Sequence, residues 1–251
     1  MKKLCFISIL ALAGCQFPQV VDYTGAHLIT SGPVEINVRS FSGNVTVIAD
    51  PTVIGTIISA QQIERGDNET PIAEPKIECT TEIKTSETGQ IVLVNAMCDD
   101  NALQLIHADI VIRAASIHNV TVETTNGNVT LLGISGAISI RTNDGDVRVV
   151  TLRVINEPVT IENRRGDIIY RVRGESSGMI DATAINGKAS LDLRQGEATI
   201  LEGSTGDHLV ANFNGGIHPL AMRTVDGDIR IAVVADPVGS EPLFNTDWIS
   251  W

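Results

Sequence analysis

The sequence predicts an all-β protein whose strands wind as a solenoid, and three observations support this prediction. Short runs of alternating β-branched residues, as in Asn119–Val150, are separated by turns that contain glycine. A turn glycine then returns about every twenty residues, which is typical of a repeat architecture. No stretch keeps the i, i+3, i+4 spacing of an amphipathic helix for long enough to predict one.

The repeat is marked by six glycines that follow a polar residue. They are the second residues of Asn126-Gly127, Asp144-Gly145, Arg165-Gly166, Asn186-Gly187, Thr205-Gly206 and Asp226-Gly227. Subtraction of neighbouring positions gives intervals of 18, 21, 21, 19 and 21 residues. After each glycine except Gly206 come a polar residue and an alternating strand, with apolar pairs Val129/Leu131, Val147/Val149, Ile168/Tyr170, Ala189/Leu191 and Ile229/Ile231. Period-2 alternation indicates that one face of each strand is buried.

Two folds are compatible with this pattern. In a β-solenoid each period is one coil, coils stack about 4.8 Å apart, and glycine permits a positive φ at a corner that returns in every coil. Alternatively, Asn-Gly and Asp-Gly are two-residue hairpin turns and the chain forms an antiparallel β-sandwich. The near-constant period favours the solenoid, because a sandwich has no reason to repeat one turn at one spacing.

Three phrases of the sequence resemble the bacterial DUF4097 family, a group of β-strand-repeat domains also called adhesin domains. They are Asp109-Ile-Val-Ile-Arg, Val122-Glu-Thr-Thr-Asn-Gly-Asn-Val-Thr-Leu and Ile140-Arg-Thr-Asn-Asp-Gly-Asp-Val-Arg-Val. The resemblance covers about residues 30 to 235. It implies a single-stranded right-handed parallel β-helix and no assigned activity.

The N-terminal segment is typical of an exported lipoprotein. Residues 1–14 have two lysines, a short apolar run and a small-residue end, which predicts a secretory signal peptide. Leu12-Ala-Gly-Cys15 is similar to the bacterial lipobox, so Cys15 is expected to carry acyl chains such as palmitate. Gln16 after the cysteine resembles the outer-membrane sorting pattern. Residues 15–30 are expected to be a tether.

The charge of the protein excludes one class of partner. After loss of Lys2 and Lys3 with the signal, 16 basic and 30 acidic side chains remain, a formal charge of −14. Such a surface repels nucleic acid and anionic headgroups. We therefore expect the lipid to hold the chain at the membrane, with an envelope protein or glycan as the partner.

The body is predicted over residues 31–235, with a less regular part at 31–118 and regular coils at 119–234. Cys79 and Cys98 flank a strand-turn-strand pattern in an exported compartment, which predicts a disulfide bridge. Residues 236–251 form a tail with both tryptophans. We expect Phe244, Trp248 and Trp251 to cap or pack along the last coil, since an open solenoid end exposes a sheet edge.

Two patterns in the sequence are candidate sites. The residues after the turn glycines include Asp146, Asp167, Asp207 and Asp228, which would stack on one corner as a weak calcium candidate. Aspartate is also a good corner residue, and this structural explanation is favoured. Gly174-Glu-Ser-Ser-Gly178 has the nucleophile-elbow spacing, but no helix is predicted after it.

No catalytic residue, metal or cofactor is therefore predicted. We expect a non-catalytic envelope scaffold or adhesin-like protein. A carbohydrate-active β-helix enzyme and an envelope-sensing regulatory module are the alternatives.

Overall fold

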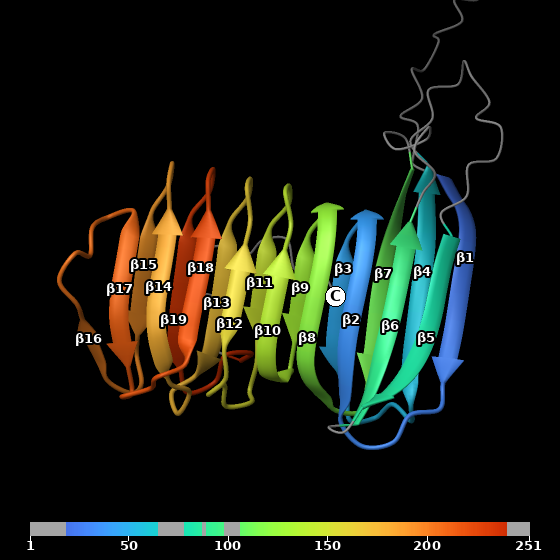
Figure 1. Ribbon diagram of the computed structural model, residues 1–251, viewed down its shortest axis with the longest axis horizontal. Coiled ribbons are helices and arrows are strands. Elements are labelled where there is room, and N and C mark those ends of the chain that lie inside the picture. Colours follow the sequence, from blue (N-terminus) through green and yellow to red (C-terminus); the bar gives the residue numbers. More distant parts are fainter. Residues whose placement is uncertain (1–18, 65–77, 87–88, 98–105, 240–251) are drawn as a thin grey trace, which may run out of the picture.

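The computed structural model describes residues 19–64, 78–86, 89–97 and 106–239. These residues form nineteen strands in two sheets that lie face to face along an elongated body (Figure 1). Sheet A has nine strands, in the spatial order β1 (Gln19–Leu28), β4 (Thr56–Glu64), β7 (Ile106–Ala114), β3 (Val45–Ala49), β9 (Val129–Leu132), β11 (Val147–Val150), β13 (Ile168–Arg173), β19 (Ile229–Val234) and β15 (Ala189–Leu193). Sheet B has ten strands, in the spatial order β16 (Ala198–Ile200), β17 (His208–Phe213), β14 (Gly178–Ala184), β18 (Pro219–Thr224), β12 (Val159–Glu162), β10 (Ser135–Arg141), β8 (Ile117–Asn126), β2 (Val34–Ser42), β6 (Gly89–Met97) and β5 (Glu78–Ser86).

The repeating unit is a coil made of one strand from each sheet. A sheet B strand runs to a glycine corner, and the following sheet A strand runs back, as in β8–β9, β10–β11 and β12–β13. Equivalent strands pair in parallel and in register, so that Val129, Val147 and Ile168 lie side by side. The predicted all-β class and the predicted alternating strands are confirmed. Among the described residues there is no helix, and hence none that could span a bilayer.

The core is a dry aliphatic layer between the two sheets. Inward side chains from β9, β11 and β13 and from β8, β10 and β12 are almost fully buried. Successive side chains of a strand point to opposite sides, so one side of each strand faces this core. Most of the outward residues of β11, β13 and β19 are buried as well, which the predicted one-sided burial did not include. Tyr170 and Phe213 are the largest fully buried side chains.

The structure differs from a single parallel β-helix in the order of its coils. The last coil in the sequence, β18–β19, lies between β12–β13 and β14–β15, and β2–β3 lies between β6–β7 and β8–β9. The two positions that are exchanged differ in burial. Ile229, Ile231 and Val233 of β19 are fully buried in the central position, whereas Leu191 and Leu193 of the edge strand β15 are only half-buried.

The two ends of the body differ from the prediction by being antiparallel. β5 pairs antiparallel with β6, and β4 with β7 and β1. At the other end β17 pairs antiparallel with β14 and β16. Both sheets are therefore mixed, with parallel coils in the centre. The antiparallel strands β1, β5 and β16 are the outermost strands at three of the four sheet edges, and the parallel strand β15 is the fourth.

The predicted tether also needs correction. Residues 19–28 form β1, which pairs along its length with β4. β1 is the edge strand of sheet A, so the segment between Cys15 and the folded body is much shorter than residues 15–30.

Candidate functional site

The turn glycines stack along one edge of the body. A Cβ on Gly127, Gly145 or Gly166 would overlap the carbonyl group of the corner glycine in the preceding coil, respectively Gly43, Gly127 and Gly145. The φ angles at these three positions are 122°, 125° and 125°, which only glycine adopts readily. Glycine therefore serves both the corner conformation and the close approach of neighbouring coils.

The stack continues in spatial order and not in sequence order. A Cβ on Gly227 would overlap Gly166, and one on Gly187 would overlap Gly227. Gly206 is the exception, because no atom lies within 4 Å of a Cβ added there. The Gly206 copy is not a coil, because β16 and β17 around it form an antiparallel pair. The weaker alternation after Gly206 was the signal for this difference.

The residues after the stacked glycines, together with Asp109, which follows Ala108, form a hydrogen-bonded series that we call the corner ladder. Its members are Asp109, Asn44, Asn128, Asp146, Asp167, Asp228 and Lys188, in spatial order. The Oδ1 atom of each member accepts a hydrogen bond from the backbone N–H of the next. The distances along the series are 2.8, 3.0, 2.8, 2.8, 2.8 and 3.0 Å. Because each bond joins two neighbouring coils, the ladder ties the corners together.

Three of the four calcium candidates are members of the corner ladder. Asp146, Asp167 and Asp228 use an oxygen for the ladder, and Arg230 lies 3.3 Å from Asp167 and 2.9 Å from Asp228. Hydrogen bonding by the Lys188 backbone, aided by Arg230, lowers the pKa of Asp228. Backbone N–H groups, and Arg230 in two cases, therefore bind these carboxylates. The three aspartates thus have the structural role expected for corner residues.

The fourth candidate, Asp207, lies outside the ladder. Its carboxylate accepts a 2.6 Å hydrogen bond from the Thr205 hydroxyl, which lowers its pKa. Within the described ranges no three histidine, cysteine, aspartate or glutamate side chains are grouped as metal ligands.

The outward side of sheet B forms a surface that we call the polar face, carried by β2, β8, β10, β12 and β18. One register row runs Arg39, Glu123, Arg141, Glu162, Arg223, with the sign of charge alternating from strand to strand. The next row runs Asn37, Thr121, Ser139, Thr160, Ala221. Neighbouring side chains of a row are about 4.8 Å apart, the spacing of hydrogen-bonded strands.

Two ion pairs join members of the charged row. The Arg39–Glu123 distance is 3.2 Å and the Arg141–Glu162 distance is 2.9 Å. All four side chains are about half-exposed or more, so each pair contributes at most about 1 kcal/mol to stability. The row therefore contributes more to the character of the surface than to stability. Positive and negative charges nearly balance along it, whereas the protein as a whole is acidic.

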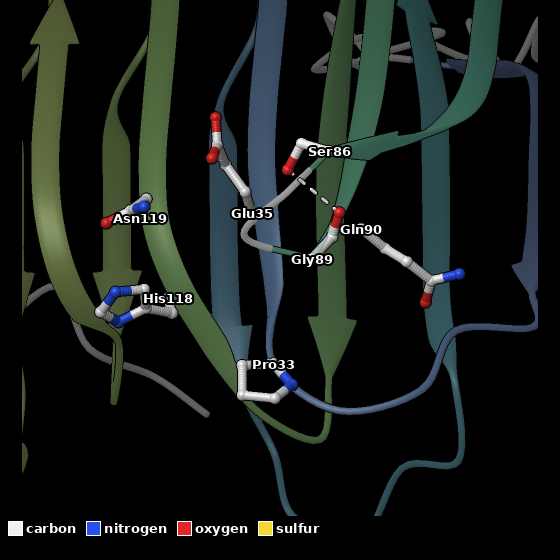
Figure 2. A pocket seen from close by; sticks show the side chains of 7 residues that line it. All are labelled: Pro33, Glu35, Ser86, Gly89, Gln90, His118 and Asn119. Atoms are coloured by element: carbon white, nitrogen blue, oxygen red, sulfur yellow. Dashed lines mark hydrogen bonds between the residues drawn. The ribbon is translucent and has the colours of Figure 1, made fainter.

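A depression of about 320 Å³ lies beside the polar face and is shown in Figure 2. Ser86 and Gly89 of the β5–β6 hairpin form one side, where the Ser86 hydroxyl donates to the Gly89 carbonyl. Asn119 stands at φ 72°, and its Oδ1 accepts from the Ala137 N–H at 2.8 Å. The remaining lining residues are Pro33, Glu35, Gln90 and His118.

The depression has polar groups but no activated nucleophile among its lining residues. The ring of His118 lies 3.4 Å from the Ser135 hydroxyl and 3.9 Å from Glu157, away from Glu35 in Figure 2. Such a site can accept a small polar group by hydrogen bonding.

The other sequence candidates are placed as follows. Ser176 of the G-x-S-x-G pattern is buried in the turn before β14, where its hydroxyl accepts from the Ile155 N–H at 3.1 Å. Cys79 is a free, half-buried thiol opposite Ala96, and burial raises its pKa. The predicted bridge from Cys79 is therefore not found, and its expected partner Cys98 lies outside the described residues. Cys15 also lies outside them, so the lipid remains a prediction.

Comparison with known proteins agrees with this architecture. The family model described as Toastrack DUF4097 matches residues 22–232. No curated protein matches the sequence. Among solved structures, the chain is similar to a "putative cell adhesion protein" from Clostridium sporogenes, with a TM-score of 0.60 and 10% identity over 86% of this chain and 100% of that chain. At that identity the likeness shows the fold alone.

Proposed function

This chain belongs to the Toastrack DUF4097 family, and we propose that it is a non-catalytic scaffold of the bacterial envelope, anchored by lipid at Cys15 and binding its partner through the polar face. The observation that carries this proposal is the pair of register rows on sheet B. They present charged and hydroxyl side chains at regular spacing across five strands. The adhesion name of the similar solved structure supports the same class of function.

The anchor part of the proposal rests on the lipobox-like Leu12–Cys15 and on the start of β1 at Gln19. Four residue steps span at most about 14 Å. Acylation at Cys15 would therefore hold the body close to the membrane. Each buried methylene contributes roughly 0.8 kcal/mol, so several acyl chains give stable attachment without a basic patch.

Radiolabelled palmitate and membrane fractionation test the anchor. The wild-type chain should incorporate label and sediment with membranes, while Cys15→Ala should do neither. Cys5→Ala is the matched control, because Cys5 lies within the predicted signal and should leave labelling unchanged. Equal labelling of the Cys15→Ala protein would refute lipidation at this position.

The binding part is tested with the purified mature protein on isolated envelope glycan and on envelope proteins. Ser139→Lys combined with Thr160→Lys changes the polar face on two exposed positions of adjacent strands. Ser190→Lys, on the outward side of edge strand β15 in sheet A, is the matched control. We expect the Ser139→Lys/Thr160→Lys variant to lose binding and the Ser190→Lys variant to keep it. Release of new sugar ends that Glu35→Gln abolishes would instead support a carbohydrate-active enzyme.

A further inference from the structure

Sheet B extends further than sheet A at the end of the body formed by β15, β16 and β17. Past β14, sheet B continues with β17 and β16, whereas sheet A ends at β15, which follows β14 in the same coil (Figure 1). The inner side of β16 therefore has no described strand of sheet A opposite it. We call this side of β16, together with the free edge of β15, the end shelf.

An exposed apolar side chain on the end shelf shows that a covering element is missing there. Ile200 of β16 lies directly opposite Ala211 of β17, so both point to the same side of sheet B. Ala211 is fully buried in the core cluster between the sheets. Ile200 is nevertheless 60% exposed. It faces the layer of sheet A at a position where the described part of sheet A has already ended.

The free edge of β15 offers backbone groups for hydrogen bonding. The Arg194 N–H donates to the Val233 carbonyl of β19 at 2.9 Å, so the backbone of Arg194 faces β19. Alternate residues of a strand direct their backbone groups to the same side. Leu191 and Leu193 therefore direct their N–H and C=O groups away from β19. Within the described ranges, neither residue has a hydrogen-bond partner on that side.

No feature of β15 itself prevents a further strand from adding to it. Its first residue, Ala189, donates to the Gly206 carbonyl at 3.0 Å, and this bond covers only the start of the edge. The strand Ala189–Leu193 contains no proline, and its register with β19 has no irregularity. Proline and β-bulges are common means by which proteins protect a sheet edge. The edge of β15 can therefore accept a strand.

The end shelf has room for one extended segment and not for a second copy joined through the same edge. In each copy β14 and β15 belong to one coil. A β15 added from a second copy would bring its own β14 into the layer where β17 already lies. A single strand does not meet this obstacle, because it occupies only the layer of sheet A.

The charge around the end shelf favours a basic segment. Glu197 precedes β16, Glu202 follows it, and both side chains are exposed. Arg194, the basic residue between β15 and β16, lies 3.7 Å from Asp192 and is already paired. The formal charge of the whole chain is −12, which also favours the approach of a basic partner.

We propose that the end shelf binds an extended basic segment of a partner protein as an additional strand of sheet A. The segment pairs with the free backbone groups of Leu191 and Leu193 and places an apolar side chain over Ile200. Its lysine or arginine residues lie near Glu197 and Glu202. In such strand addition, main-chain hydrogen bonds supply affinity and alternate side chains supply specificity. The end shelf is separate from the polar face and is a second interaction surface.

Two short synthetic peptides of alternating valine and threonine test the end shelf on the mature protein. One peptide has lysine at both ends and the other has glutamate. The lysine peptide should bind at least about tenfold more tightly, because like charges repel across an interface. It should also slow amide hydrogen exchange at Leu191 and Leu193. Absence of binding, or slowed exchange only at other strands, would overturn the proposal.

A matched pair of variants locates the bound peptide. Ile200→Lys places a cation on the end shelf and should weaken binding of the lysine peptide at least about tenfold. Thr199→Lys makes the same change in charge on the opposite side of β16 and should leave binding unchanged. Both side chains are exposed, so neither change removes a buried contact. Equal effects of the two variants would overturn the proposal.

The Ser139→Lys/Thr160→Lys variant separates the end shelf from the polar face. These changes should leave binding of the lysine peptide unchanged, whatever they do to binding of an envelope partner. Loss of peptide binding in this variant would place the peptide on the polar face and overturn the proposal.

A second copy and another part of the same chain are the competing occupants of the end shelf. Hydrogen exchange of the protein alone distinguishes both from an open edge. The Leu191 and Leu193 amides should exchange faster than the Arg194 amide, which is bonded to β19. Equally slow exchange without peptide would show that the edge is already occupied and would overturn the proposal. Sedimentation at several concentrations would then identify the occupant as a second copy or as the same chain.

Discussion

Substitution of Gly166 by alanine gives the sharpest measure of the corner stack. The φ of 125° places this residue in a region that side-chain-bearing residues avoid, at a cost of about 1–3 kcal/mol. An added Cβ would also lie 2.7 Å from the Gly145 carbonyl carbon and 2.9 Å from an Asp146 carboxylate oxygen, and would overlap the Gly145 carbonyl oxygen. Since the Gly145 backbone is itself bonded to the next coil, the overlap adds about 1–3 kcal/mol.

The two contributions together predict a loss of about 4 kcal/mol in the free energy of unfolding. For a chain of this size the corresponding fall in Tm is roughly 8 to 16 °C. Urea denaturation and thermal melts of the mature protein, followed by far-ultraviolet circular dichroism, measure both quantities. A loss of this size requires that neighbouring corners stay in contact in solution.

Gly206→Ala is the control for this experiment. Gly206 also follows a polar residue, Thr205, and has nearly the same spacing in the sequence, but no atom lies within 4 Å of an added Cβ. Alanine there should change stability by no more than about 1 kcal/mol, with a small gain from the restricted unfolded chain. Equal losses in the free energy of unfolding at Gly166 and Gly206 would refute the stack of corner glycines. They would instead support a repeat whose coils stack in sequence order.

Three further measurements probe the ladder and the core. Asp146→Ala should cost about 1–3 kcal/mol in urea denaturation because the Asp167 N–H loses its acceptor, and Asp146→Asn should restore most of that loss because the acceptor oxygen is kept. The folded-state pKa of Asp228 lies below the ordinary value of 3.8, so its contribution to stability is full above that pH and is lost as pH falls through the lower folded pKa. Asp228→Asn should therefore flatten the pH dependence of Tm below about pH 4, and an unchanged slope would contradict the ladder. Tyr170→Phe removes a buried hydroxyl to which the described part of the chain offers no hydrogen-bond partner, so stability should stay unchanged or rise by up to about 2 kcal/mol. A clear loss of stability would show that the hydroxyl has a hydrogen-bond partner.

The strands themselves could be predicted from the sequence with good accuracy. Val147/Val149 and Ile168/Tyr170 fall on the inward side of β11 and β13, as alternation requires. The corner glycines could be predicted for the same reason, because a positive φ and a following β-branched strand are both local properties.

The order of the coils could not be predicted in this way. All coils share one pattern, so the sequence does not state which copy lies beside which. The exchange of β18–β19 with β14–β15 follows from competition for the buried central position. The ladder member Asp109 could not be predicted either, because it follows Ala108 and not a glycine and joins the corner only when β7 and β3 lie side by side.

The sequence by itself determined the all-β class, the coil with its glycine corner, and the polar or apolar character of each strand face. These features depend on backbone sterics and on a period of two, which act over a few residues. Only the tertiary structure decided the spatial order of coils, the antiparallel ends, the exclusion of Gly206 and the rows of the polar face. Each of these depends on pairing between segments far apart in the chain, where burial of the most apolar strands selects one arrangement among several with the same local pattern.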